Sequence, residues 1–240
     1  MTVPIPLMPN EQESLAGYLW RLSEVNGYTG VDHLRRVYSK PLTLWKSMHR
    51  PYRGDDAEDK LIPHLIAITG LKAEVFRESL FKDLPGKNER DNRVDVSLFD
   101  WRIGVPRICP DCLLQAAMMP KEWELLPFSV CPVHKKSLIH ECPACGESLD
   151  LHADLATHCH ACEVKWADSC IENREVPEYQ AEWLAAKNGS EWLHEFGWML
   201  LKAVRPMDFQ HNGIKFYDAP VSRLPTLLDA AWNLMKSGRA

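Results

Sequence analysis

Seven cysteines and one histidine form four pairs whose two side chains stand three positions apart. The pairs are Cys109 and Cys112, Cys131 and His134, Cys142 and Cys145, and Cys159 and Cys162. Two donors at this spacing can face one ion because a tight turn folds the backbone around it, and thiolate and imidazole are ligands that Zn²⁺ prefers. The pattern therefore predicts two zinc ions with four protein ligands each.

The order of the pairs leaves two arrangements open. Sequential pairing gives one ion to Cys109, Cys112, Cys131 and His134 and the other to Cys142, Cys145, Cys159 and Cys162, whereas a cross-braced arrangement exchanges the pairs. Loops of eighteen and thirteen residues separate the sequential pairs. Such lengths are typical of zinc ribbons, in which each knuckle caps a short hairpin, and they favour sequential pairing. His140, His152, His158 and His160 are near enough to replace a ligand, although solvent contacts or hydrogen bonds to the ligands suit them better.

Four protein ligands leave an ion no position for water or substrate, so both ions are expected to be structural. The chain also has no Gly-rich phosphate loop, no nucleophile elbow and no His-Glu-x-x-His helix. The acidic run that starts at Asp55 could be imagined as a nuclease site, but adjacent acids usually form a solvated loop or a helix start. The unpaired Cys170 is expected to be a small buried apolar residue. We therefore expect a protein that is not an enzyme.

The composition is that of an ordinary globular protein. The chain has 240 residues, of which 45% are hydrophobic and 25% are charged, and this length allows one or two domains. No apolar run approaches the roughly 20 residues that span a membrane. The N-terminus lacks the basic and apolar regions of a secretory signal, and metal-ligand cysteines suit a reducing compartment. We expect a cytoplasmic protein with no membrane role.

Charge is distributed unevenly along the chain. Residues 109–170 carry 4 Lys and Arg against 9 Asp and Glu, so the surface of the predicted metal region should repel phosphate. Residues 33–54 instead hold six basic side chains and no acid: Arg35, Arg36, Lys40, Lys46, Arg50 and Arg53. With the aromatic rings among them, these cations could bind nucleic acid. The alternative is a solvated helix face with aromatic residues in the core.

Apolar periodicity predicts a mainly α-helical chain with small β elements in the zinc ribbons. Helices are expected over residues 14–25, from Val31, and from Pro41, and together they fit a helix-turn-helix unit. The apolar segment that begins at Leu61 is expected to be interrupted by Pro63, and a second helical pair is expected over 66–81. Tail helices are expected over 178–187, 190–204 and 225–236. The polar segment 87–93 is the best candidate for a linker. We predict a helix-turn-helix domain over 1–90, a linker over 91–108, tandem zinc ribbons over 109–170 and a C-terminal helical unit over 171–240.

Three segments resemble the TniQ and TnsD target-selection proteins of bacterial transposons that use an AAA+ ATPase, including CRISPR-associated ones. The first runs from Glu13-Ser14-Leu15 to Leu22, and the second is Ile68-Thr69-Gly70-Leu71. The third and most specific includes Ile108-Cys109-Pro110-Asp111-Cys112, Trp123, Val130-Cys131-Pro132-Val133-His134 and Glu141-Cys142-Pro143-Ala144-Cys145-Gly146. Together they cover about residues 11–165.

The resemblance implies a bacterial adaptor that recognises a chosen target and recruits the transposon ATPase. It places the zinc ligands on the eight residues above and the helix-turn-helix on about residues 14–53. Its partners would be a CRISPR effector complex with its guide RNA, target DNA and the AAA+ ATPase, and pairing with a second copy stays open. The short chain and acidic zinc region favour the CRISPR-linked kind, in which guide RNA reads the sequence. The alternative is a sequence-specific DNA-binding protein that selects an attachment site.

Overall fold

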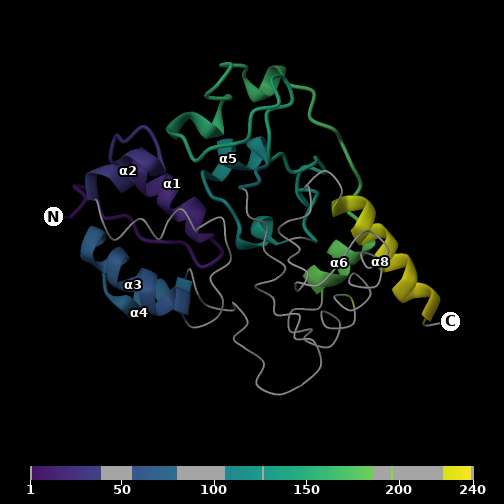
Figure 1. The fold of residues 1–240 in the computed structure, drawn as a ribbon, viewed down its shortest axis with the longest axis horizontal. Helices are drawn as coiled ribbons and strands as arrows, with labels where there is room; N and C mark the ends of the chain where they lie inside the picture. Colours follow the sequence, from purple (N-terminus) through teal and green to yellow (C-terminus); the bar gives the residue numbers. More distant parts are fainter. Residues whose placement is uncertain are drawn as a thin grey trace, which may run out of the picture.

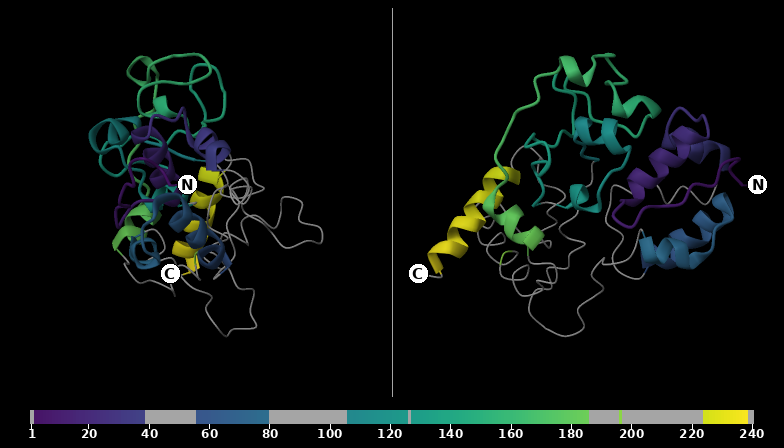
Figure 2. Two further views of the ribbon diagram at one scale, coloured as in Figure 1. Left: turned by 90° about the vertical axis from the view of Figure 1, so that its left-hand side faces the viewer. Right: turned by 180° about the vertical axis from the view of Figure 1, so that it is seen from behind.

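The computed structural model describes residues 2–38, 56–79, 106–125, 127–185, 196 and 224–238. Figure 1 shows three groups of elements: helices α1 to α4 near the N-terminus, a central region with little regular structure, and helices α6 and α8 near the C-terminus. The view from behind in Figure 2 places the N-terminal helices and the tail helices on opposite sides of the central region. Helices therefore flank the region that contains the Cys and His pairs.

Helix α1 spans Leu15–Val25 and helix α2 spans Val31–Tyr38. The Ser14 hydroxyl accepts a hydrogen bond from the Gly17 N–H at 3.0 Å, which satisfies one of the free donors at the start of α1. The two helices contact each other, and Tyr18, Trp20 and Leu34 are buried. The third helix expected from Pro41 lies outside the described residues, so the helix-turn-helix stays a prediction.

Helix α3, over Asp56–Thr69, packs against helix α4, over Ala73–Ser79. The sequence predicted an interruption at Pro63, but the helix continues through it. A proline inside a helix costs about 3 kcal/mol. Four other side chains of α3 are buried, those of Leu61, Ile62, Leu65 and Ile68, and each contributes about 1.5–3 kcal/mol. Their burial outweighs the lost hydrogen bond.

The central region is held by short helices and isolated antiparallel bridges. It contains α5 (Pro110–Ala116) and three 3-10 turns, η3 (Lys121–Glu124), η4 (Ala153–Ala156) and η5 (Trp166–Asp168). The bridges Val130 to Ser137, Glu141 to Ser148 and His158 to Lys165 each close a short hairpin. A fourth bridge joins Ile108 to Ile139. The expected mainly helical fold with small β elements is thus observed for the described residues.

One hydrophobic core runs from the N-terminal helices into the central region. It includes Trp20 and Leu34 on one side and Leu151, Leu155 and Trp166 on the other. The predicted helical and metal-binding units therefore pack together instead of forming separate cores. The domain boundaries predicted from the sequence remain predictions.

The tail has a smaller aromatic cluster. Helix α6 spans Glu178–Ala185 and helix α8 spans Leu224–Gly238, and both were expected from the sequence. The ring of Tyr179 stacks on Phe196 at 5.7 Å between centroids, and Trp232 meets both rings edge to face. Apart from Phe196, the helix expected over 190–204 lies outside the described residues. None of the helices in the described part of the chain is both long and apolar enough to cross a membrane.

Candidate metal centres

Three of the four knuckles share one backbone geometry. In each, the first cysteine donates its N–H to the carbonyl five residues later and accepts at its carbonyl from the N–H four residues later. The residue four positions after that cysteine has positive φ: Lys135 at 50°, Gly146 at 73° and Glu163 at 60°. This left-handed residue closes the turn and brings the two donors to the same side. These are the hairpin-capping knuckles that the sequence predicted.

The first knuckle is built differently from this expectation. Cys109 is the N-cap of α5, and Pro110 occupies the first helical position, where its missing N–H costs nothing. Cys112 then lies one helical turn later, on the same side as Cys109. The predicted hairpin is therefore replaced by a helix start, because the proline and the run after it favour a helix.

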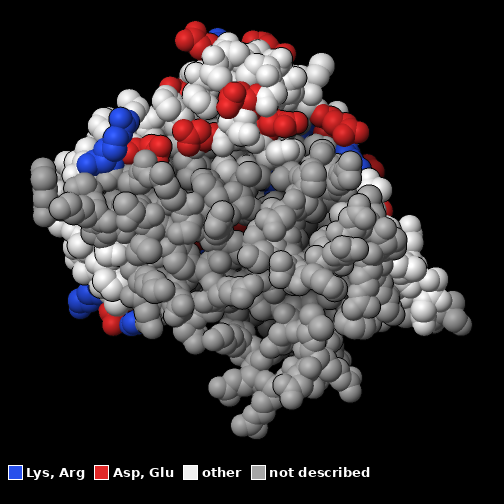
Figure 3. All heavy atoms as spheres, in the orientation of Figure 1, with Lys and Arg blue, Asp and Glu red and all other residues white. Residues whose placement is uncertain are grey.

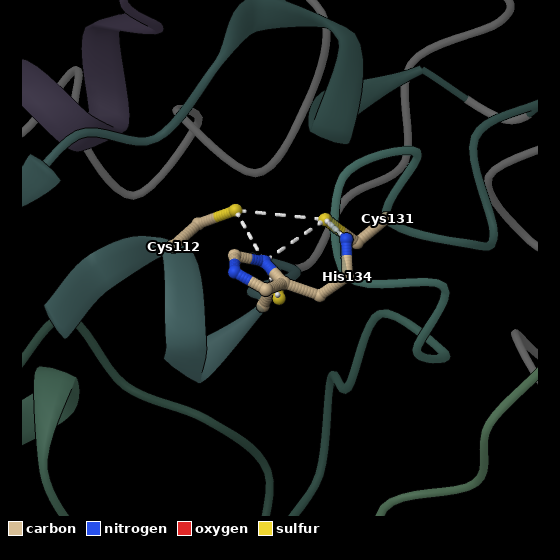
Figure 4. Close-up of side chains that lie close together, drawn as sticks. Cys112, Cys131 and His134 are labelled. Atoms are coloured by element: carbon tan, nitrogen blue, oxygen red, sulfur yellow. Dashed lines mark hydrogen bonds between the residues drawn. The ribbon is translucent and has the colours of Figure 1, made fainter. Parts of the chain in front are cut away.

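The first group consists of Cys109, Cys112, Cys131 and His134. Figure 4 shows the Sγ atoms of Cys112 and Cys131 beside the ring of His134. His134 Nδ1 lies 3.5 Å from Cys109 Sγ, 3.2 Å from Cys112 Sγ and 3.7 Å from Cys131 Sγ, and the last two sulfurs are 3.5 Å apart. The imidazole thus presents Nδ1 to all three sulfurs.

The second group consists of Cys142, Cys145, Cys159 and Cys162. Cys142 Sγ lies 3.7 Å from Cys162 Sγ, and Cys145 Sγ lies 3.8 Å from Cys159 Sγ. In each group the four ligand atoms lie within 4.8 Å of one another. Both groups follow the sequential pairing.

These separations fit tetrahedral zinc. Zn–S bonds of about 2.3 Å and Zn–N bonds of about 2.0 Å place neighbouring ligand atoms about 3.5–3.8 Å apart in a tetrahedron. A disulfide would instead bring two sulfurs to about 2.05 Å. The donor chemistry and spacing of both groups therefore suit a metal ion with four protein ligands.

Hydrogen bonds and burial shift the pKa values of the thiols in the first group. The hydrogen bond between Cys109 and Cys131, in which Cys131 accepts, raises the pKa of Cys109 well above its ordinary value and lowers that of Cys131 to about 4. Burial raises the pKa of Cys112 to about 12. Metal binding must therefore displace thiol protons, which makes affinity depend on pH.

Gln115, on α5, contacts the other side of the His134 ring. Its side-chain nitrogen lies 3.0 Å from Nε2. When Nδ1 binds a metal, Nε2 carries the ring hydrogen, and Gln115 can accept it with its amide turned to present the oxygen. Lys136 Nζ also reaches Asp111 Oδ2 at 2.7 Å, which ties the second knuckle to α5. Sequence reasoning missed Gln115, although its place three residues after Cys112 put it on the same helix face.

Two buried polar side chains hold the surroundings of the first group. Arg107 donates to the carbonyl of Trp123 at 2.9 Å and to that of Leu125, and burial lowers its pKa to about 9. Gln180, at the start of α6, accepts from the Ser129 and Val130 N–H groups at 3.2 Å and donates to the Val130 carbonyl at 2.5 Å. No local pattern in the sequence indicates either role.

The other histidines join neither group among the residues that the structure describes. His152 stacks on His160 with 5.6 Å between ring centroids, and Asp154 lies 3.4 Å from His152 Nδ1 and 3.9 Å from His158 Nε2. The prediction for Cys170 was wrong, because its side chain is exposed. It follows η5 in a segment without regular secondary structure.

The basic segment is described only in part. Arg36 lies exposed on α2, and the backbone of Arg35 lies beside it. The Arg35 side chain and residues Lys40, Lys46, Arg50 and Arg53 lie outside the part of the chain that the structure describes. A nucleic-acid contact by these six residues therefore stays a prediction.

Comparison with known proteins identifies a family. A family model described as TniQ matches residues 4–138, which is more than half of the chain. The match includes α1 to α5 and the whole of the first ligand group. No match was found among the curated proteins.

Proposed function

The chain belongs to the TniQ family, and we propose that it is a non-enzymatic adaptor between a guide-RNA effector complex on target DNA and the transposon AAA+ ATPase. Family membership makes it a transposition-related target-selection protein. The effector complex, guide RNA and ATPase follow from the resemblance noted in the sequence. The observation that carries the proposal is the family match, together with two ligand groups that leave no catalytic position.

In this proposal the eight ligands hold two structural zinc ions. Cys109, Cys112, Cys131 and His134 would bind one, and Cys142, Cys145, Cys159 and Cys162 the other. When bound, each ion supplies only cross-linking, because four protein ligands complete a tetrahedron and exclude water. Its binding free energy then adds to the folding free energy of a region with little regular secondary structure.

The surface of the metal region supports a protein-docking role. Figure 3 shows acidic side chains spread over this part of the molecule. Exposed examples are Glu141, Glu147, Asp150, Asp154, Glu163, Glu172 and Glu175. Three thiolates around Zn²⁺ give the first site a formal charge of about −1, and four give the second about −2. Such a face repels phosphate and attracts a basic protein surface.

The basic segment would supply the contact to nucleic acid. Arg35, Arg36, Lys40, Lys46, Arg50 and Arg53 could neutralise backbone phosphates without reading bases, so affinity should fall steeply with salt. Changing Arg35, Arg36, Arg50 and Arg53 to Glu should abolish binding to RNA or DNA and leave two zinc ions bound. A gel-shift titration and metal analysis of the same sample test both expectations.

The adaptor role is tested by a pull-down with the purified effector complex and the ATPase. We expect the chain to retain both partners together and each one separately. Loss of both would contradict the adaptor role. The DNA-reader alternative predicts instead that the chain prefers one duplex site over random duplex by roughly 10³ or more. An adaptor should bind random duplex and chosen duplex equally.

A further inference from the structure

Each ligand group spans a loop that meets the start of one N-terminal helix. The loop within the first group passes Met119, whose carbonyl accepts from the Ser14 N–H at 2.8 Å, where α1 begins. The loop within the second group, residues 146–158, reaches the start of α2. Helices α1 and α2 are thus each hydrogen-bonded to a chain segment that lies between metal ligands.

The contact with α2 is made by backbone groups on both sides. The Val31 N–H donates to the Leu151 carbonyl at 3.0 Å, and the Ala153 N–H donates to the Thr29 carbonyl at 3.1 Å. The Trp20 indole N–H on α1 adds a bond to the His152 carbonyl at 2.8 Å. These bonds fix the first residue of α2 against residues 151–153.

Gly30 shows how closely the two segments approach. Its φ is +145°, and a Cβ placed there would lie 2.7 Å from the Leu151 carbonyl oxygen. Neither the backbone conformation nor the space suits any other residue. Leu151 and Leu155 are also buried in the same core as Trp20 and Val31, so apolar packing accompanies the hydrogen bonds.

The loop that receives Gly30, residues 146–158, has little regular structure apart from η4. We call this loop the seat of α2. Its ends are Cys145 and Cys159, whose Sγ atoms lie 3.8 Å apart. An ion bound between them would close the loop and remove most of its conformational freedom. Without the ion, the shape that receives Gly30 would depend on packing, on the Glu141 to Ser148 and His158 to Lys165 bridges, and on the hydrogen bond from the Trp166 indole to the Leu155 carbonyl.

We infer that the Cys142, Cys145, Cys159 and Cys162 centre positions helix α2 by fixing residues 146–158 as its seat. This deepens the proposed function and rests on it in one respect, since α2 carries the start of the basic segment. Metal occupancy and nucleic-acid affinity are then linked, and linkage requires each to strengthen the other by the same factor. The ion acts through position and touches no nucleic acid.

The test uses the full chain with zinc bound and measures amide hydrogen exchange of residues 29–34. Cys145→Ser removes an exposed ligand, and exchange there should rise by about tenfold or more, because each lost hydrogen bond changes the opening equilibrium about fivefold. Cys112→Ser, in the other group, should leave these amides protected. Binding to random-sequence duplex is measured separately on each variant.

A second variant separates the seat from the ion. Gly30→Ala retains all eight ligands and should bind two zinc ions, yet raise exchange at residues 29–34 as Cys145→Ser does. Gly27→Ala is the matched control, because Gly27 also has positive φ, at +73°, but an added Cβ there meets no atom within 4 Å. Its effect is expected to be smaller and confined to the turn.

The inference is overturned if Cys145→Ser leaves residues 29–34 as protected as in the unmodified chain, whether or not Gly30→Ala exposes them. It is supported if both variants expose these amides. That support holds even if the unmodified chain fails to bind nucleic acid, in which case the nucleic-acid part of the proposed function fails and the positioning of α2 stands.

Discussion

The two ligand groups share their knuckle spacing but differ in their surroundings. In the first, Cys109 and Cys131 are buried and the other two ligands are half-buried, whereas in the second Cys145 and Cys162 are exposed. The first group is enclosed by α5, by the buried Arg107 and by the tail through Gln180. The second has hairpins on both sides and depends more on its own ligands for shape.

This difference indicates that equal spacing does not give equal stability. A buried ligand group keeps its form through packing and hydrogen bonds, while an exposed group keeps it mainly through the metal. We therefore expect the first centre to release its metal more slowly. We also expect substitution of one of its buried ligands to lower the free energy of unfolding more than substitution of an exposed ligand of the second centre.

The largest effect is expected from changing a buried ligand. A structural zinc contributes on the order of 10 kcal/mol of binding free energy, so Cys109→Ser and Cys145→Ser should each lose one ion. Cys109→Ser should destabilise the fold further, by about 1–3 kcal/mol, because it leaves a buried hydroxyl without its partner. Metal analysis and denaturant unfolding measure both quantities. Equal unfolding midpoints for the two variants would remove the proposed difference between the centres.

The next largest effect is expected at the contact between the tail and the first centre. Gln180→Ala removes three hydrogen bonds to the second knuckle's hairpin and should lower the free energy of unfolding by at least about 2 kcal/mol. Denaturant unfolding followed by tryptophan fluorescence measures it. Asn173→Ala, an exposed change nearby, serves as the control. If both variants unfold alike, the tail does not support the first centre.

A smaller effect is expected from the contact between Gln115 and His134, the one histidine among the eight proposed ligands. Gln115→Ala should weaken zinc binding at the first centre about 10–100-fold, because the contact that orients His134 is lost. Competition with a chromophoric chelator measures the zinc affinity of both centres, and the affinity of the second centre should not change. Gln115→Glu should restore most of the affinity, since a carboxylate accepts the same ring hydrogen. Leu114→Ala, an exposed neighbour on α5, is the control.

The smallest effect concerns pH and the tail helices. Hydrogen bonds from Lys236 and Trp232 lower the pKa of Glu178 below its ordinary value of 4.5. A carboxylate with a lowered folded-state pKa stabilises the fold above pH 4.5, and this contribution is lost as the pH falls through the folded-state pKa. The protection factors of the α8 amides, in which the measured exchange is corrected for the intrinsic pH dependence of amide exchange, should therefore fall on acidification, and Glu178→Gln should reduce this fall. Glu175→Gln, at a more exposed ion pair, should match the unmodified chain.

The sequence predicted the features that local patterns encode. Knuckle spacing identified the eight residues that the fold gathers into two groups and favoured the sequential grouping, and apolar periodicity located α1, α6 and α8. The same reasoning failed where distant segments decide the outcome. Pro63 remains helical because of packing, and Cys109 begins a helix instead of a hairpin.

The supporting contacts were beyond local patterns for the same reason. Gly30 meets Leu151 at a separation of 121 residues, and Gln180 meets Val130 at a separation of 50 residues. Glycine and glutamine are common at such positions for many reasons, so neither residue type signals its partner. Only the assembled fold shows that they join the helices and the tail to the metal region.

The bridge between Ile108 and Ile139 has a mechanical consequence. Each residue donates its N–H to the other's carbonyl at 2.9 Å, immediately before the first ligand of one group and three residues before that of the other. A force on one metal-binding unit is therefore transmitted through these two hydrogen bonds to the other unit. In a large assembly, the two units would then rotate together as one rigid body.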